Sequence, residues 1–320
     1  MNAPTSPFVD HVARLLAYKQ ALGVAYVRER RFFAEVERLT IGWPDAVLSE
    51  ALVRTYLAGG PKDSRPHRLT AIRALARFLV VEEPRTFVPP PRFLGIRRRR
   101  PPVTRVLSRE EAGRFLLACD ALPNVAALPH GLVRGTALRV LLLTGLRRGE
   151  LLALQDRDVD LVEQVVTVRC GKFGKMRFVP LSPDLVDRLR TQREALSALL
   201  GDRHPADAFF PGRDGRHPLK RHRLHKAFRD VLDLAQIPYL GRGRGPRLHD
   251  LRHSFAVLRL LTWYEIRADL GAKLPLLATY LGHVGLASTQ VYLHMTDDLV
   301  GEVVARQREA FGDLITEVAP

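Results

Sequence analysis

The chain has 320 residues, of which 46% are hydrophobic, so it is long enough for two domains and too apolar to be intrinsically disordered. No uncharged apolar run could span a bilayer, and two cysteines, Cys119 and Cys170, are too few for a disulfide framework or for a zinc site of their own. The net charge of +16 favours a polyanionic partner, nucleic acid first, over a surface that is cationic only for solubility.

The N-terminal part of the chain carries four apolar patterns at helical spacing, at residues 8–22, 26–39, 46–58 and 65–82. No strand pattern precedes residue 100, so we predict an all-helical domain at 1–87. The cations on its later helices either face DNA phosphates or form an ordinary solvated surface. The predicted DNA contacts among them are Arg68 and Arg73.

A basic, proline-rich segment follows, and we interpret residues 88–106 as an interdomain linker. Proline favours an extended chain, and like charges repel one another. The segment contains four consecutive arginines, Arg97, Arg98, Arg99 and Arg100, which would lie along a DNA backbone passing between two domains. Basic linkers also occur without such a partner.

The second domain is predicted at 107–320 and is mostly helical. Ser108 and Glu111 fit a capping box, and a helix is expected at about 131–143. Strands are expected at 165–169 and 176–181 around a turn at 171–174, with a third near 158–161, and helices after Pro183 to the end. The predicted fold class is therefore mainly α with a small antiparallel β-sheet.

Near the end of the chain, His283 precedes Tyr292 by nine residues. The intervening segment 287–291 is typical of a short helix that Ser288 or Thr289 would cap. A tyrosine there is a usable nucleophile only if other residues transfer its proton and stabilise the developing charge.

Candidates for those roles occur earlier in the chain. Arg147 lies where one helix is expected to end and another to begin, with Glu150 one turn on to orient it or to cap the new helix. Lys172 lies at the tip of the predicted turn. His249 and Arg252 are three residues apart, on one face of a helix.

The ordered set of Arg147, Lys172, His249, Arg252, His283 and Tyr292 closely resembles the tyrosine recombinase (phage integrase) family. The resemblance rests on Thr144-Gly-Leu-Arg-Arg-Gly-Glu-Leu, on His249-Asp-Leu-Arg and on the segments 171–181 and 281–283. It covers about 105–295, and the N-terminal domain in outline as the family's SAM-like core-binding domain.

Two departures from the family pattern stand out. Phe173 replaces the second glycine of the usual turn, so the general acid is Lys172 or Lys175, with alignment from Val179 favouring Lys172. The span from Arg252 to His283 is also longer than usual, and it is similar to a subgroup carried on bacterial mobile elements.

The resemblance implies a site-specific recombinase that cleaves and rejoins DNA through a 3′-phosphotyrosine on Tyr292. Arg147 and Arg252 would stabilise the phosphoryl oxygens, and Lys172 would protonate the leaving 5′-oxygen. His249 would carry the tyrosine proton, and His283 would hydrogen-bond the phosphate. Lys175 and Arg177 are further candidates for DNA contact. No ATP, metal or other cofactor is expected.

The partners that the resemblance implies are double-stranded DNA with inverted-repeat sites and further copies of the chain. These copies would form a homotetramer on DNA from free monomers or dimers, or act with related recombinases. An apolar stripe after Thr296 would pack on its own domain or dock on a neighbouring subunit. The N-terminus lacks the apolar core of a signal peptide, so a cytoplasmic location at the bacterial nucleoid is expected, without a membrane partner.

Two other functions remain open from the sequence. One is DNA relaxation by a type IB topoisomerase, which uses similar residues. The other is a DNA-binding protein that has lost catalysis, against which the full set of six matched residues argues.

Overall fold

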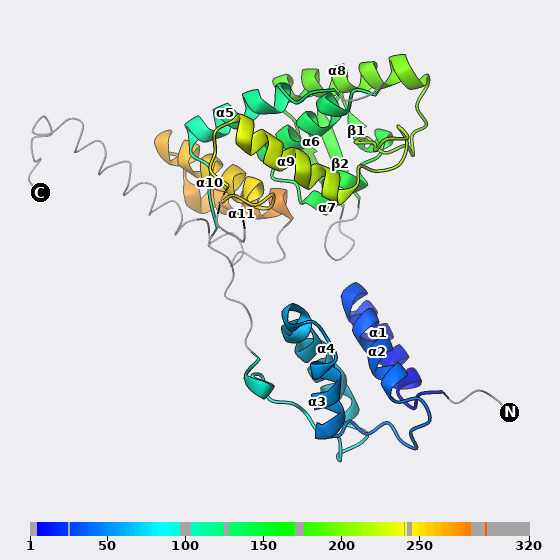
Figure 1. The fold of residues 1–320 in the computed structure, drawn as a ribbon. Helices are drawn as coiled ribbons and strands as arrows, with labels where there is room; N and C mark the ends of the chain where they lie inside the picture. The colour runs from blue at the N-terminus through cyan, green and yellow to red at the C-terminus, as the bar shows by residue number, and fades with distance from the viewer. Residues whose placement is uncertain are drawn as a thin grey trace, which may run out of the picture. The chain divides into compact units, whose positions relative to one another are not determined.

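The computed structural model describes residues 5–24, 26–96, 104–124, 128–169, 176–239, 241, 245–282 and 292. The chain divides into two compact units, Met1–Pro101 and Pro102–Pro320 (Figure 1), and the division falls inside the segment 88–106. Each unit has its own hydrophobic core.

The first unit contains helices α1 (Val9–Ala21), α2 (Val27–Leu39), α3 (Glu50–Ala58) and α4 (Arg65–Leu79), with short 3₁₀ turns at Lys62–Ser64 and Phe93–Gly95. All four predicted helices are present. The third begins later than expected because the Ser49 hydroxyl caps it, accepting from the backbone N–H of Leu52 at 3.1 Å. Side chains such as Phe33, Leu48 and Ile72 are fully buried between these helices.

The second unit is built around one buried helix, α6 (His130–Thr144), against which α5 (Arg109–Asp120), α8 (Pro183–Leu200), α9 (Arg221–Leu234) and α10 (Asp250–Glu265) pack (Figure 1). Gly135 allows the close approach of α5, because a Cβ there would lie 2.1 Å from the carbonyl oxygen of Cys119. The predicted capping box of Ser108 and Glu111 is confirmed at the start of α5. The shorter α7 (Arg148–Ala153) follows α6 directly.

A three-stranded antiparallel sheet has the order β1 (Val159–Asp160), β2 (Val165–Val168), β3 (Arg177–Pro180). Val166 pairs with Val179, and both are buried. The sheet and the mainly helical architecture confirm the predicted fold class. The predicted turn at 171–174 lies outside the described residues.

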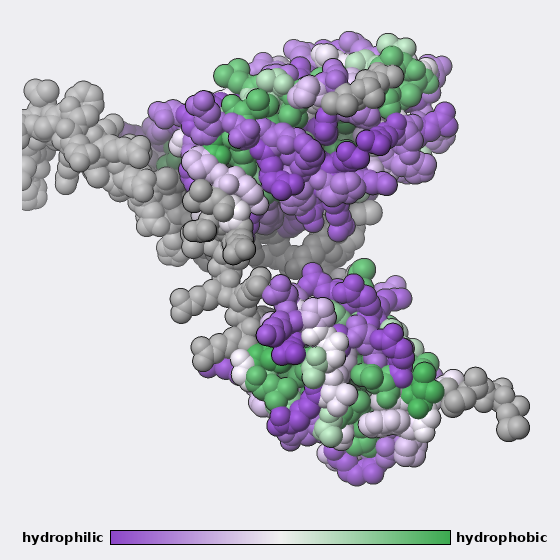
Figure 2. All heavy atoms as spheres, viewed as in Figure 1, coloured by the Kyte–Doolittle hydropathy of each residue, from purple (hydrophilic) through white to green (hydrophobic). Residues whose placement is uncertain are grey.

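Helices α10 and α11 (Leu270–Leu281) enclose a smaller apolar cluster that includes Phe255, Leu260, Leu277, Leu281 and Tyr292. The visible face of the second unit is strongly hydrophilic over α9 (Figure 2), where Arg221, Lys226 and Arg229 are exposed. Among the described residues, no helix is both long enough and apolar enough to cross a membrane.

Candidate active site

The turn between α6 and α7 presents Arg147. Gly145 ends α6 with a φ of 62°, and a Cβ there would lie 2.6 Å from Cδ1 of Phe255, so both conformation and space require glycine. The backbone N–H of Arg147 then donates to Oε2 of Glu150 at 2.9 Å, and its Nη1 donates to Oε1 at 2.8 Å. Glu150 therefore both caps α7 and orients Arg147, the two roles that the sequence suggested.

Glu150 is the fixed anion of this site. Arg177, on β3, forms a two-point hydrogen bond with its carboxylate. Nη1 donates to Oε1 at 3.0 Å, and Nη2 donates to Oε2 at 2.7 Å. Burial alone would raise the pKa of Glu150, but the hydrogen bonds from Arg177 and from the backbone of Arg147 outweigh it and lower the pKa below its ordinary value. The carboxylate is therefore ionised at neutral pH.

This placement does not favour the predicted contact between Arg177 and DNA. Its side chain is only 11% exposed, and its Nε donates to the carbonyl oxygen of Tyr280 at 2.9 Å. The guanidinium is therefore committed to Glu150 and to the end of α11, and it is not presented to a phosphate.

Arg252 lies in the first turn of α10 and is 3% exposed. Its Nη1 donates to the carbonyl oxygen of Gly145 at 2.8 Å, and its Nη2 to that of Leu281 at 2.7 Å. Burial, and next the charge of Arg147, lower the pKa of Arg252 to about 10, so the group remains a cation at neutral pH. Neutral carbonyls orient this cation without neutralising it.

Tyr292 lies beside Arg252 and is 2% exposed. Burial raises the pKa of its phenol, while the charge of Arg252, a hydrogen bond with Arg252 and the charge of Arg147 act in the opposite direction. The net shift is upward, so the hydroxyl is protonated at neutral pH and needs a base before it can attack. The arginines also stabilise the phenolate that would form.

Tyr280 is the alternative nucleophile, and its setting differs. Its ring stacks on Phe255 with centroids 5.5 Å apart, and burial raises its pKa to about 12. Tyr280 is partly buried and packs against the apolar clusters, and its phenolate would be hard to form.

Two histidines of one helix face line up toward Tyr292. His249 is the N-cap residue of α10, and His253 lies one turn later, with ring centroids 4.9 Å apart. The His253 ring is in turn 5.5 Å from that of Tyr292. Burial lowers the pKa of His249, as does the charge of Arg252, so its ring is neutral at pH 7 and is able to accept a proton.

His253 was missed by sequence reasoning, although its position four residues after His249 puts it on the same helix face. Burial, followed by the charge on His249, lowers its pKa to about 4. Its Nδ1 is buried without a hydrogen-bond partner among the described residues.

The structure thus brings together Arg147, His249, Arg252 and Tyr292, which come from three separate stretches of the sequence. Lys172, Lys175, His283 and the linker arginines Arg97, Arg98, Arg99 and Arg100 lie outside the described residues. Within the described part of the chain, no group of three or more histidine, cysteine, aspartate or glutamate residues could hold a metal ion.

The two DNA contacts predicted in the first unit have different settings. Arg68 is 3% exposed, pairs with Glu35 and donates from Nη2 to the carbonyl oxygen of Tyr56 at 2.5 Å. This burial does not favour the predicted contact between Arg68 and DNA phosphates. Arg73 instead borders an open cavity of about 1080 Å³.

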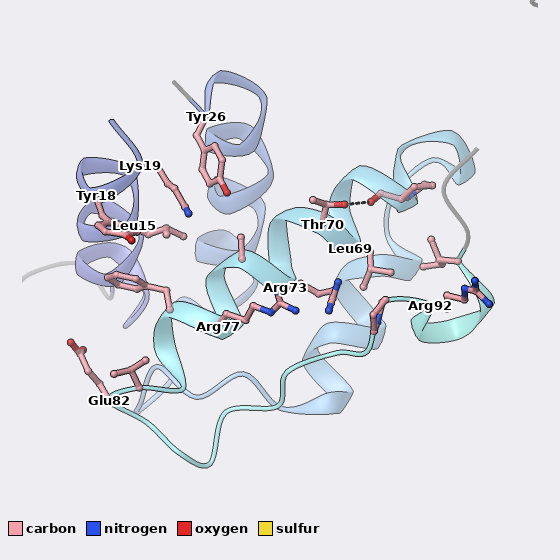
Figure 3. A pocket seen from close by; sticks show the side chains of 16 residues that line it. Leu15, Tyr18, Lys19, Tyr26, Leu69, Thr70, Arg73, Arg77, Glu82 and Arg92 are labelled. Carbon is pink, nitrogen blue, oxygen red and sulfur yellow. Dashed lines mark hydrogen bonds between the residues drawn. The ribbon is translucent and has the colours of Figure 1, made fainter. Parts of the chain in front are cut away.

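That cavity lies among α1, the start of α2, α4 and the segment 91–96, and cations and aromatic rings line it together with apolar side chains and the carboxylate of Glu82 (Figure 3). Lys19, Arg77 and Arg92 join Arg73 around it, together with Tyr18 and Tyr26. Cations and flat rings are the two side-chain types that bind phosphates and bases. In the sequence, Lys19 and Arg77 look like Arg73, because each is a cation on a helix with apolar residues at helical spacing.

A model described as the phage integrase family matches residues 105–298. The protein of Sinorhizobium fredii named "Putative integrase/recombinase y4rE" is 34% identical over 303 residues, which is 93% of this chain and 94% of that protein. Tyrosine recombinase XerD of Pseudomonas aeruginosa is 33% identical over 74% of this chain and 73% of that protein.

Among solved structures, the XerH site-specific recombinase in a post-cleavage complex with its palindromic difH substrate aligns with a TM-score of 0.56. It is 21% identical, and the alignment covers 80% of this chain and 70% of that one. The chain belongs to the phage integrase family. It is a tyrosine-type site-specific DNA recombinase, which confirms the class that the sequence predicted.

Proposed function

We propose that Tyr292 is the nucleophile of a DNA strand exchange in which Arg147 and Arg252 bind the scissile phosphate. The Tyr292 oxygen forms a bond to phosphorus as the bond to the 5′-oxygen breaks, leaving a 3′-phosphotyrosine and a free 5′-hydroxyl. His249 accepts the phenol proton, and Lys172 supplies a proton to the 5′-oxygen. His283 donates to a nonbridging oxygen. Attack by the 5′-hydroxyl of a partner strand reverses the step.

The observation that carries this proposal is the burial of the Tyr292 hydroxyl against an arginine that has no acidic partner within ion-pair distance among the described residues. Arg147 donates from its side chain to Glu150 and Gly282 O, and Arg252 donates to Gly145 O and Leu281 O and also hydrogen-bonds Tyr292. A guanidinium has five N–H groups, so both arginines retain N–H groups for an oxyanion. A phosphodiester is the anion that would complete this site, because planar guanidiniums bind its oxygens in pairs.

The test is covalent trapping on a nicked suicide substrate, from which the cleaved strand end diffuses away. Tyr292→Phe is expected to bind DNA normally and to form no covalent adduct. Tyr280→Phe is the matched control, since it removes the hydroxyl of a partly buried tyrosine on α11, and it should still form adduct. A covalent adduct that still forms in Tyr292→Phe would overturn the assignment, and its loss in Tyr280→Phe would point to Tyr280 as the nucleophile.

The proposed substrate is double-stranded DNA whose sites are inverted repeats around a short spacer, acted on in the cytoplasm at the nucleoid. In the first unit, the cavity bordered by Lys19, Arg73 and Arg77 supports backbone contacts there. Replacing Arg97, Arg98, Arg99 and Arg100 together by glutamine should weaken binding to every sequence and flatten its salt dependence. An unchanged slope of log K against log salt would exclude these arginines from the contact.

The proposed assembly is a homotetramer on DNA in which the apolar stripe after Thr296 docks on a neighbouring copy. An apolar groove of about 360 Å³ between α6, α8, α10 and α11 supports this, with Leu143, Leu277 and Trp263 in its lining and Leu276 exposed at its edge. Phe311→Asp and Leu276→Asp should each bind DNA yet assemble poorly, because a charge would be desolvated in the contact. Normal synaptic complexes from both variants would exclude this docking.

A further inference from the structure

The C-terminal end of α11 binds three arginines through three successive backbone carbonyls. Tyr280 O accepts from Nε of Arg177 at 2.9 Å, Leu281 O from Nη2 of Arg252 at 2.7 Å, and Gly282 O from Nη2 of Arg147 at 2.9 Å. The last carbonyls of a helix have no partner within it and carry partial negative charge. One helix end therefore sets the positions of all three guanidiniums.

Of the three, Arg177 is used differently from Arg147 and Arg252. All three of its nitrogens donate to protein, Nε to Tyr280 and both Nη atoms to Glu150. Its side chain is 11% exposed, whereas that of Arg147 is 29% exposed. Gly282 packs so closely over Arg177 that a Cβ there would lie 3.0 Å from Nη1. Arg177 is thus more enclosed by protein than Arg147.

We propose that Arg177 is a positioning residue for DNA cleavage, acting through Glu150 and the end of α11. This inference rests on the proposed roles of Arg147 and Arg252 as phosphate ligands. Arg177 holds the Glu150 carboxylate in an orientation in which the Arg147 side chain makes only one hydrogen bond to it, beside the one from the Arg147 backbone N–H. It also fixes Tyr280, and with it the point from which the chain continues toward Tyr292.

The charges on these groups explain why the third arginine matters. Glu150 is shared between Arg147 and Arg177, so its charge does not neutralise Arg147 fully. Without Arg177, the carboxylate is free to turn and engage both ends of the Arg147 guanidinium, the geometry that carboxylates and arginines prefer. Both ends of the Arg147 guanidinium would then donate to Glu150, and fewer of its N–H groups would remain to bind the phosphate.

The experiment compares Arg177→Met and Arg177→Lys with the matched control Arg190→Met. Arg190 is an exposed arginine of α8 that pairs only with Asp187 among the described residues, so its replacement removes the same charge away from the site. For each variant, the DNA dissociation constant, the single-turnover rate of adduct formation on the nicked suicide substrate and the thermal unfolding of the protein are measured. If Arg177→Met does not fold, Arg177→Lys carries the comparison, because it keeps the charge and most of the buried stem.

Arg177→Met is expected to bind DNA within about twofold of the parent while its cleavage rate falls about 10²-fold, the loss typical of a displaced catalytic group. Arg177→Lys should recover only part of the rate, since an ammonium cannot form the paired contact with Glu150. Arg190→Met should cleave normally. An unchanged cleavage rate in both Arg177 variants overturns the proposal. A weaker DNA affinity that also depends less on salt overturns it too, because it would make Arg177 a direct DNA contact.

A substrate with a neutral methylphosphonate at the scissile position separates positioning from a general loss of structure. One nonbridging oxygen is replaced by a methyl group there. The rate of adduct formation then depends less on an arginine, such as Arg147, that would bind the missing oxygen. The effect of Arg177→Met should shrink on one of the two diastereomers. An equal loss on all substrates would show a general structural role and overturn the proposal. Adduct formation by Tyr292→Phe would instead contradict the proposed function itself.

Discussion

Two arginines of this chain, Arg68 in the first unit and Arg252 in the second, are equally buried at 3% exposure, yet their surroundings are opposite in kind. Arg68 pairs with the carboxylate of Glu35 and donates to the carbonyl of Tyr56, and its guanidinium lies 4.2 Å from the centre of the Tyr56 ring. An anion, a dipole and a π-face surround its charge, although its Nε has no hydrogen-bond partner among the described residues. Its own domain thus supplies what a buried cation needs.

Arg252 is held by two neutral carbonyls, and the charged side chains nearest to it include the cations Arg147 and Arg177. Its pKa is lowered to about 10 by burial and then by the charge of Arg147. The folded state therefore disfavours the charged form of Arg252 relative to the unfolded chain. A buried cation that is oriented and left without a direct acidic partner, within the described residues, identifies a site for an anion from outside. Burial alone does not distinguish Arg68 from Arg252, but the groups that hold each guanidinium do.

The largest expected effect is on catalysis. Arg252→Met should lower the single-turnover rate of adduct formation by about 10²–10³-fold, the usual loss on removing one preorganised donor. Arg68→Met, measured at saturating DNA on the same suicide substrate, should cleave at the parent rate. Equal losses in the two variants would mean that the two arginines do not differ in function.

The next effect concerns stability, where the order of the two variants reverses. Arg68→Met leaves Glu35 without its partner and should lower the free energy of unfolding by about 2–3 kcal/mol, below the cost for a fully buried pair because the Glu35 side chain is 26% exposed. Urea unfolding measures this. Adding Glu35→Met should restore most of the loss, since the uncompensated charge is then gone. Arg252→Met should lose less, because it removes a charge that burial disfavours.

The sequence could place both arginines on helices, but it could not tell which of them is satisfied. Apolar spacing predicts the helices and strands because periodicity follows from the local backbone, and the second-unit motifs predict Arg147 and Arg252 by resemblance. The partners of these arginines are set by tertiary contacts across long stretches of chain, such as that between Arg252 and Leu281 O. For the same reason Arg68 and Arg177 resembled DNA contacts in the sequence, and His253 was overlooked.

A smaller effect is expected from pH. Burial, then the charge of Arg252, lowers the pKa of His249 from its ordinary value, so the neutral, proton-accepting form predominates at neutral pH. The rate of adduct formation should therefore be flat at and above pH 7 and should decline only in acid, by up to about tenfold per pH unit. His249→Gln should be slow at all pH values and should lose this acid limb. A parent profile that falls already between pH 8 and pH 7 would contradict His249 as the base.

The smallest effect tests the unsatisfied charge of Arg252 directly, without DNA. An oxyanion that binds at Arg147 and Arg252 stabilises the folded protein according to its affinity, by roughly 1.4 kcal/mol at ten times its Kd. Sulfate should therefore raise the melting temperature by a few degrees over chloride at equal ionic strength. Sulfate also stabilises proteins by exclusion from their surfaces. The relevant quantity is therefore the difference between the sulfate-induced rise in melting temperature of the parent and that of Arg252→Met.

Arg68→Met supplies the second half of that comparison. It loses a cation of equal burial whose anion is already present, so its response to sulfate should match that of the parent. A saturable sulfate effect in the parent and in Arg68→Met, absent from Arg252→Met, would place the anion site at Arg252. The same gain in all three proteins would mean that the carbonyls of Gly145 and Leu281 satisfy Arg252 on their own, and that its burial does not by itself identify a phosphate site.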